Sequence, residues 1–225
     1  MQTISIAIDG PSGAGKSTLA RSIAAKLGYL YVDTGAIYRT IGYHALSAGI
    51  DPKDEEAVSA ALPGLRVELA YGEDGLQRMF LNGQDVTSEI RLPEVSMYAS
   101  AVSAHPPVRA YLLEMQRELA RTNNVIMDGR DIGTVVLPDA QVKVFLTASP
   151  EARAKRRMLE LEQRGTPQPF EQILKDIQER DWNDSHRATA PLRQAEDAVL
   201  LDTTELTFRE SEAALLDIIR KRTEA

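Results

Sequence analysis

The chain of 225 residues contains no cysteine and only three histidines, and each shortage excludes a class of protein. Without thiols it has neither disulfides nor thiolate metal sites, and His44, His105 and His186 are too scattered to indicate a zinc site. The sequence also lacks the basic start of a signal peptide and any apolar run near the roughly 18 residues of a membrane span. We therefore expect a soluble, unprocessed cytoplasmic protein that does not contact a membrane.

Positive charge is also in short supply. Lysine and arginine total 26 against 33 aspartate and glutamate residues, a formal net charge of −7. This balance argues against general binding to nucleic acid or to anionic membranes. Any anion site must therefore be a local cluster of arginines. The length and the 43% apolar content fit one sizeable core with room for a small insertion.

A glycine-rich segment near the N-terminus is the most informative feature present. It matches the P-loop pattern G-x-x-x-x-G-K-[ST] and consists of Gly10, Pro11, Ser12, Gly13, Ala14, Gly15, Lys16, Ser17 and Thr18. A strand-like run, 3–8, precedes it, and a predicted helix, 17–27, follows and ends at Gly28. The glycines allow backbone N–H groups to converge on phosphates, Lys16 can reach the β- and γ-phosphates, and the Ser17 hydroxyl is placed to bind Mg²⁺. The segment predicts binding of ATP with Mg²⁺.

Further strand-like runs predict an α/β fold with a parallel sheet flanked by helices. They are short and mostly apolar, and segments of helical period separate them. The runs are 29–32, 125–127, 142–146 and 198–201. Ligands of such sheets gather beyond the carboxyl ends of the strands. Polar residues stand there: Asp9, Asp33, Asp128 to Asp131, Thr147 and Asp202.

Two segments depart from this pattern. Between Pro63 and about Glu89, alternating apolar residues and the turn pair Asn82-Gly83 predict an antiparallel hairpin with a short extension. From Ser149 to Trp182 the chain is helical and rich in arginine, with a Gly/Pro break at 165–169, which suits a lid. We expect residues 1–62 and 101–225 to form a P-loop core with the lid at about 152–181. Residues 63–100 are expected to form the inserted domain.

Arginines separate the possible P-loop activities. Arg39, Arg130 and Arg187 are expected in loops or at element ends near the predicted crevice, and several guanidinium groups suit a site that holds two polyanions together. A phosphate acceptor is already deprotonated, so phosphoryl transfer to it requires positioning and cations rather than a strong base. The guanine-reading pattern N-K-x-D is absent from the sequence, which excludes regulatory GTPases.

The motifs closely resemble those of the bacterial cytidylate kinase family over nearly the whole chain. The segments that carry the resemblance are IDGPSGAGKS at 8–17, VDTGAIYR at 32–39, DGRDIGTVV at 128–136 and DSHRATAPL at 184–192. The hairpin is similar to the enlarged monophosphate-binding domain of this family. The resemblance implies transfer of the ATP γ-phosphoryl group to CMP or dCMP.

By the same resemblance, site residues can be assigned one by one. Arg39 and Arg130 would hold the acceptor phosphate, with Tyr38 beside them. The residues that would read cytosine are Thr34, Arg109, Asp131 and Arg187. Those that would contact the sugar are Ser100, Arg180 and Asp184. Arg156 and Arg157 in the lid are candidates to neutralise the transferring phosphate, with Arg157, Lys16, Arg39 and Arg130 as the catalytic set.

Two positions differ among members of the family. Some carry Ser in place of Thr34, which keeps the hydroxyl, and some carry Gly in place of Ser17 and remain active. The family therefore does not require this hydroxyl as a direct metal ligand. Ser17 stays the one metal-ligand candidate in this chain, while nucleotide oxygens and water would hold most of the Mg²⁺. Asp33 and Asp128 are candidates for indirect contact with the metal.

Other functions remain open at this stage. A kinase for UMP or another small molecule is the nearest alternative, and the pair Asp131 and Arg187 argues for cytosine instead. A regulatory module that binds ATP without transfer would not need Arg39 and Arg130. We expect a monomer, because no exposed apolar stripe or heptad stands out.

Overall fold

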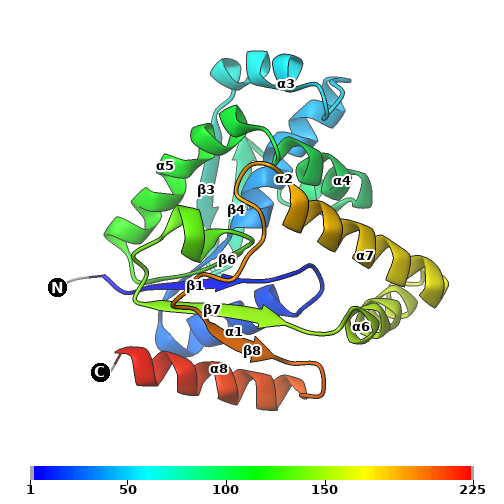
Figure 1. Ribbon diagram of the computed structural model, residues 1–225. Helices are drawn as coiled ribbons and strands as arrows, with labels where there is room; N and C mark the ends of the chain where they lie inside the picture. Colours follow the sequence, from blue (N-terminus) through cyan, green and yellow to red (C-terminus); the bar gives the residue numbers. More distant parts are fainter. Residues whose placement is uncertain (1–2, 224–225) are drawn as a thin grey trace. The chain divides into compact units, whose positions relative to one another are not determined.

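The computed structural model describes residues 3–223 and places them in an α/β fold with one five-stranded and one three-stranded sheet (Figure 1). The strands are β1 (Ser5–Asp9), β2 (Leu30–Asp33), β3 (Val67–Tyr71), β4 (Gln77–Leu81), β5 (Gln84–Asp85), β6 (Val125–Gly129), β7 (Val142–Thr147) and β8 (Val199–Asp202). The helices are α1 (Lys16–Leu27), α2 (Thr34–Ser47), α3 (Glu55–Ala61), α4 (Pro93–Val102), α5 (Pro106–Thr122), α6 (Pro150–Gln163), α7 (Phe170–His186) and α8 (Phe208–Thr223). Short helical segments are η1 (Leu62–Gly64), η2 (Glu89–Arg91) and η3 (Ile132–Val136).

The five-stranded sheet has the order β2-β6-β1-β7-β8. Strand β1 lies at its centre and pairs in parallel with β6 and β7, while β7 pairs in parallel with β8. The predicted parallel sheet is therefore confirmed, with strand ends shifted by one or two residues from the expected ones. The chain leaves the central strand directly into the P-loop, so the loop lies at the carboxyl edge of the sheet.

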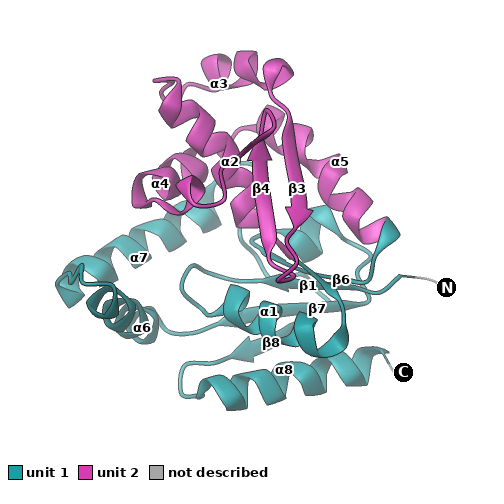
Figure 2. Ribbon diagram, turned by 180° about the vertical axis from the view of Figure 1, so that it is seen from behind, with its two compact units in different colours: residues 1–31, 122–225 teal, residues 32–121 magenta. Residues whose placement is uncertain are grey.

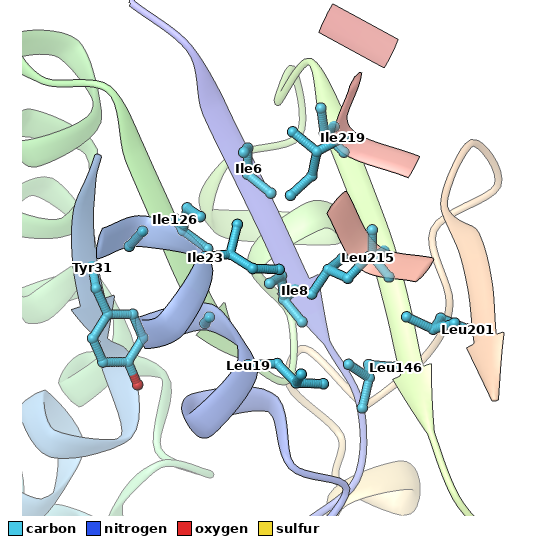
Figure 3. Close-up of a cluster of buried hydrophobic side chains, with 14 of the residues drawn as sticks. Ile6, Ile8, Leu19, Ile23, Tyr31, Ile126, Leu146, Leu201, Leu215 and Ile219 are labelled. Carbon is cyan, nitrogen blue, oxygen red and sulfur yellow. The ribbon is translucent and has the colours of Figure 1, made fainter. Parts of the chain in front are cut away.

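Helices α1 and α8 cover one face of this sheet and form its core with β1 and β7 (Figure 3). The apolar residues of both helices repeat at intervals of three or four, which places them on one side of each helix. The largest members of the cluster are Ile6, Ile8, Leu19, Ile23, Tyr31, Ile126, Leu146, Leu201, Leu215 and Ile219. Burial of this surface fixes β1, and with it the start of the P-loop.

The chain divides into two compact units (Figure 2). The first runs up to Tyr31 and resumes at Thr122, and it contains the P-loop, the lid helices and most of the large sheet. The second, Val32–Arg121, contains α2 to α4, most of α5 and the three-stranded sheet. The segment 63–100 that was expected to be the insertion lies inside the second unit.

The second unit contains the expected hairpin. Strands β3 and β4 pair antiparallel, and β5 adds the short extension through a tight turn at Asn82 and Gly83. Both turn residues have positive φ, 52° and 82°, as a two-residue hairpin turn requires. Helices α2 and α4 approach closely at Gly42. A Cβ there would lie 2.7 Å from the backbone nitrogen of Ala99, so only glycine permits this distance.

The predicted lid forms two helices, α6 and α7, in the first unit. A small apolar cluster of Ala154, Leu161, Ile173 and Ile177 joins them. Gly165, with a φ of 74°, ends the first helix where the sequence has its Gly/Pro break. The helical arrangement of this segment is therefore confirmed.

Candidate active site

The P-loop requires its glycines for steric reasons. Gly10 has a φ of 150°, and a Cβ there would lie 1.9 Å from the carbonyl oxygen of Leu146. Gly13 and Gly15 have φ values of 75° and 89°, and Gly15 directly precedes α1. Left-handed residues at these points turn successive N–H groups toward one side, which makes a concave anion site at a helix N-terminus.

Lys16 is a buried cation at the first position of α1. Its side chain curls back so that Nζ donates to the carbonyl oxygen of Pro11 at 2.8 Å, and the residue is 5% exposed. Burial, and after it the nearby Arg130 guanidinium, lower the pKa of Lys16 from 10.5 to about 7. A polyphosphate bound in the loop would raise this pKa again, because its negative charge would stabilise the charged form of Lys16.

Oxygen ligands for a hard cation stand beside the loop. The Ser17 hydroxyl donates to Asp128 Oδ2 at 2.9 Å, and the Tyr31 hydroxyl donates to Asp128 Oδ1 at 2.7 Å. A hydroxyl and a carboxylate together are the chemistry that Mg²⁺ selects, so these residues fit the metal. Asp128 thus contacts the P-loop through Ser17.

Five predicted substrate residues belong to the first unit: Arg130 and Asp131 follow β6, Arg180 and Asp184 lie in the second half of α7, and Arg187 directly follows that helix. The Arg130 Nε donates to Asp184 Oδ2 at 2.6 Å, and Arg187 Nη2 lies 3.5 Å from Asp131 Oδ1. Burial would raise the pKa of Asp184, but Arg130 and, more weakly, Arg180 and Arg187 outweigh it and lower that pKa. The structure thus brings together three guanidinium groups and two carboxylates that are separate in sequence.

The other five predicted substrate residues belong to the second unit. Thr34, Tyr38 and Arg39 lie on α2, Ser100 lies on α4 and Arg109 lies on α5. The Arg109 guanidinium stands over the Tyr38 ring, 5.5 Å from its centroid. The Arg109 side chain also donates to the carbonyl oxygen of Ser103 at 3.1 Å.

The expectation that Arg39 lies in a loop or at an element end is wrong. Arg39 lies inside α2, because Asp33 caps the helix by accepting from the Ala36 N–H at 2.9 Å and the helix continues to Ser47. From the second turn its Nη2 reaches back to Asp33 Oδ2 at 2.8 Å. Although Arg39 lies within a helix, its guanidinium group therefore still lies beside Asp33 at the end of β2.

The sequence reasoning missed Arg91, and it noted Asp9 as a polar residue at a strand end without giving it a role. Arg91 Nη1 donates to Asp33 Oδ2 at 2.9 Å, so this aspartate binds two guanidinium groups. Asp9 accepts from the Ile132 and Gly133 N–H groups, both at 2.7 Å. Arg91 carries no local signal, whereas Asp9 carried a usable one, since it is a charged residue at the end of a buried strand.

The two candidate lid arginines differ in their contacts. Arg156 donates through Nη2 to the carbonyl oxygen of Thr203 at 2.5 Å, which commits it to the main chain. Arg157 pairs with Glu160 at 2.8 Å, and its side chain is 41% exposed. Arg157 is therefore the one of the two whose guanidinium can exchange a surface carboxylate for a phosphate.

Within residues 3–223, no helix combines the length and the apolar character needed to cross a membrane. The same residues hold no group of three or more His, Asp or Glu side chains placed to bind a metal ion.

Comparisons with known proteins identify the family of the chain. The family model described as cytidylate kinase matches residues 6–221. A cytidylate kinase of Caldicellulosiruptor bescii is 50% identical over 98% of this chain and 97% of that protein. Cytidylate kinases of Oceanobacillus iheyensis and Caldicellulosiruptor saccharolyticus are 50% and 49% identical over 98% of this chain and 95% and 97% of theirs. With a family model that matches nearly the whole chain and relatives at about half identity, the chain belongs to the cytidylate kinase family.

Proposed function

We propose that this protein transfers the γ-phosphoryl group of ATP to CMP or dCMP and releases ADP with CDP or dCDP. The observation that carries the proposal is the cluster of Arg130, Asp131, Asp184 and Arg187 in the same unit as an intact P-loop. A protein that only bound ATP would need the loop alone. Paired carboxylates that preorganise arginines suit a second anionic ligand.

ATP is proposed to bind along the P-loop from Gly10 to Thr18. The N–H groups of the loop and the start of α1 would hold the β-phosphate, and Lys16 would reach the β- and γ-phosphates. On binding, Lys16 would exchange the Pro11 carbonyl for phosphate oxygens and regain a fully charged ammonium group. ATP binding would thus replace a single carbonyl partner of this buried side chain by several anionic ones.

Mg²⁺ with ATP is proposed as the cofactor. Ser17, oriented by Asp128, would hold the metal together with nucleotide oxygens and water. When bound, the metal supplies positive charge that offsets the negative charge of the phosphates.

The acceptor phosphate is proposed to bind Arg39 and Arg130, with Tyr38 beside them. Each guanidinium is held by one carboxylate in the free protein, Arg39 by Asp33 and Arg130 by Asp184. A guanidinium has five N–H donors, so a carboxylate can orient one edge while other donors bind phosphate. The side chains are thereby ordered before the substrate arrives.

The base and the sugar are proposed to bind the remaining residues. Thr34, Arg109, Asp131 and Arg187 would read cytosine, with a carboxylate accepting from the exocyclic amine. Uracil has a carbonyl at that position and would bind less well. Ser100, Arg180 and Asp184 would contact the sugar. Because both CMP and dCMP are proposed as acceptors, the contact with the 2′-hydroxyl is expected to be dispensable.

Transfer needs no general base in this arrangement. An acceptor phosphate oxygen is already an anion, so it attacks the γ-phosphorus while the bond to the β-phosphate oxygen breaks and ADP leaves. Lys16, Arg130 and Arg157 would stabilise the charge on the transferring group. The helices α6 and α7 would act as a lid that keeps water away from it.

The organisation of the protein follows from the same proposal. We propose that residues 63–100 serve the monophosphate side, that residues 1–62 and 101–225 form the core, and that the protein acts as a monomer. The reaction is assigned to the cytoplasm, because ATP and CMP are available there.

A coupled assay of ADP release tests the proposed function. The protein is incubated with ATP and Mg²⁺ and with CMP, dCMP, UMP, AMP or GMP, alongside a control without acceptor. Strong turnover with CMP and dCMP alone supports both the reaction and its base specificity. Equal turnover with UMP would overturn the cytosine assignment, and slow ADP release independent of any acceptor would overturn transfer to a nucleotide.

A further inference from the structure

Arg153 on α6 is a charged residue that the proposed reaction does not use, and it is 2% exposed. A buried guanidinium is stable only when its donors are bound. Those of Arg153 are bound to four acceptor atoms: Nε donates to the carbonyl oxygen of Ala148 at 2.8 Å and Nη1 to that of Ser12 at 3.0 Å. The Asp181 carboxylate accepts from Nη1 at 3.0 Å and from Nη2 at 2.5 Å.

These contacts join three parts of the first unit. Arg153 lies near the start of α6, Asp181 lies on α7, and Ser12 lies in the P-loop. The aliphatic part of Arg153 also covers the loop, because a Cβ on Gly13 would lie 3.5 Å from Arg153 Cβ. The residue therefore packs against the loop with its stem and bonds to it with its charge.

The bond to Ser12 has a consequence for the phosphate site. The Ser12 carbonyl and the Gly13 N–H belong to one planar trans peptide, so they point in opposite directions. When Arg153 holds the carbonyl on its own side, the Gly13 N–H is held toward the opposite side. An anion site made of backbone donors depends on such orientations, since a rotated peptide presents an oxygen instead of an N–H.

The neighbouring arginines of α6 bind other partners. Arg156 bonds to Thr203, and Arg157 and Arg164 pair with Glu160 on their own helix. Thr203 and Glu160 both lie outside the P-loop. Arg153 thus differs from its neighbours both in burial and in the element that it holds.

We infer that Arg153 is a positioning residue for ATP: it fixes the Ser12–Gly13 peptide of the P-loop, and Asp181 orients it for this task. The inference rests on the proposed use of ATP and adds a residue that never touches the nucleotide. The Asp181 carboxylate accepts from both Nη atoms and so fixes the orientation of the guanidinium group. We therefore assign Asp181 a role only through Arg153.

The test uses Arg153→Met, which keeps the stem over Gly13 and removes the donors. The matched control is Arg121→Met, at an exposed arginine that bonds Glu114 and Glu118. Affinity for Mg-ATP is measured by titration calorimetry without acceptor, and the KM for ATP and for CMP by ADP release. We expect Arg153→Met to weaken ATP binding about 10-fold or more. The KM for CMP should stay within twofold, and the control should match the wild type.

A lower kcat with an unchanged ATP affinity would overturn the inference, because that is the result of a smaller folded fraction. An equal rise in both KM values would overturn it as well. Calorimetry needs no acceptor, so a wild type that binds ATP without phosphorylating CMP would contradict the proposed function and still leave the role of Arg153 open to this test.

Asp181→Asn tests the orienting role and serves if Arg153→Met does not fold. It should weaken ATP binding about threefold. The double variant should bind ATP no more weakly than Arg153→Met alone, because nothing remains for Asp181 to orient. Additive effects, or an Asp181→Asn variant with wild-type affinity, would contradict the assigned link.

Discussion

An equally buried aspartate stands at the end of β1 and at the end of β2, yet the pKa values of the two carboxyl groups shift in opposite directions. Asp9 ends β1 and Asp33 ends β2, and each is 5% exposed. Asp9 accepts only from backbone N–H groups, and burial raises its pKa from 3.8 to about 6. For Asp33 burial also acts upward, but Arg39, Arg91 and the Ala36 N–H outweigh it and lower the pKa.

The difference shows that burial alone does not decide the state of a carboxylate. Neutral donors only partly compensate for the loss of water, whereas two guanidinium groups overcompensate. At the end of β1, Asp9 fixes the backbone that follows Asp131. At the end of β2, Asp33 binds two guanidinium groups. We expect the first to serve the phosphate donor and the second to serve the acceptor.

Replacing Lys16, the buried cation of the P-loop that follows β1, should have the largest effect. Lys16→Met keeps the length of the stem and deletes the charge that would follow the γ-phosphoryl group. We expect kcat to fall about 1000-fold, or about 4 kcal/mol, with the KM for CMP within twofold. Lys26→Met, at an exposed lysine of the same helix, is the control. A loss below tenfold would remove Lys16 from the transition state.

Replacing Arg39, which binds Asp33 at the end of β2, should affect CMP rather than ATP. For Arg39→Met we expect kcat/KM for CMP to fall about 100-fold, or about 3 kcal/mol, because a bond to a charged phosphate is lost. ATP affinity, measured by calorimetry, should be unchanged. Arg66→Met, at an exposed arginine, is the control. Weaker ATP binding by the same factor would abolish the division between the two regions.

The two aspartates should also differ in how stability follows pH. The folded pKa of Asp9 lies above its unfolded value, so ionisation between about pH 4 and pH 6 removes up to about 3 kcal/mol of stability. The folded pKa of Asp33 lies below 3.8, so its contribution is present above that pH and is lost only as the pH falls further.

Urea unfolding of the wild type, Asp9→Asn and Asp33→Asn between pH 4.5 and pH 7 measures this. As the pH rises, the free energy of unfolding of the wild type should fall relative to that of Asp9→Asn. The corresponding difference for Asp33→Asn should stay level across the range. A level Asp9 difference would show that backbone donors suffice to hold its charge.

The smallest effect is expected at Arg91, the second cation on Asp33. Its side chain is 47% exposed, and an exposed pair contributes little, so Arg91→Met should lower the free energy of unfolding by less than about 1 kcal/mol. The KM for CMP should change less than threefold. An effect as large as that of Arg39→Met would make Arg91 a substrate residue.

Sequence reasoning succeeded where a local pattern carries the information. The P-loop, the hairpin with Asn82-Gly83 and the two lid helices all have turn residues or periodicity that stand in the chain itself. The same is true of the polar residues at strand ends. These signals sufficed for the fold class and for the P-loop, the hairpin and the lid helices.

Contacts between distant segments could not be predicted in this way. Nothing near Arg91 or Arg153 in sequence indicates that one reaches Asp33 and the other reaches Ser12. Arg39 was expected in a loop or at an element end, whereas the cap at Asp33 begins α2 and places Arg39 inside this helix. Long side chains act several ångströms from their own backbone, so only the folded chain reveals their partners.

The contact of Gly42 with α4 has a consequence for how mutational scans of this protein should be interpreted. Any side chain at Gly42 would push against the backbone of Ala99 and move α4, which carries Ser100, relative to α2, which carries Tyr38 and Arg39. Replacement would therefore lower activity as a catalytic substitution does, although hydrogen is the only group that Gly42 presents. In such a scan, intolerance marks fixed spacing as readily as chemistry.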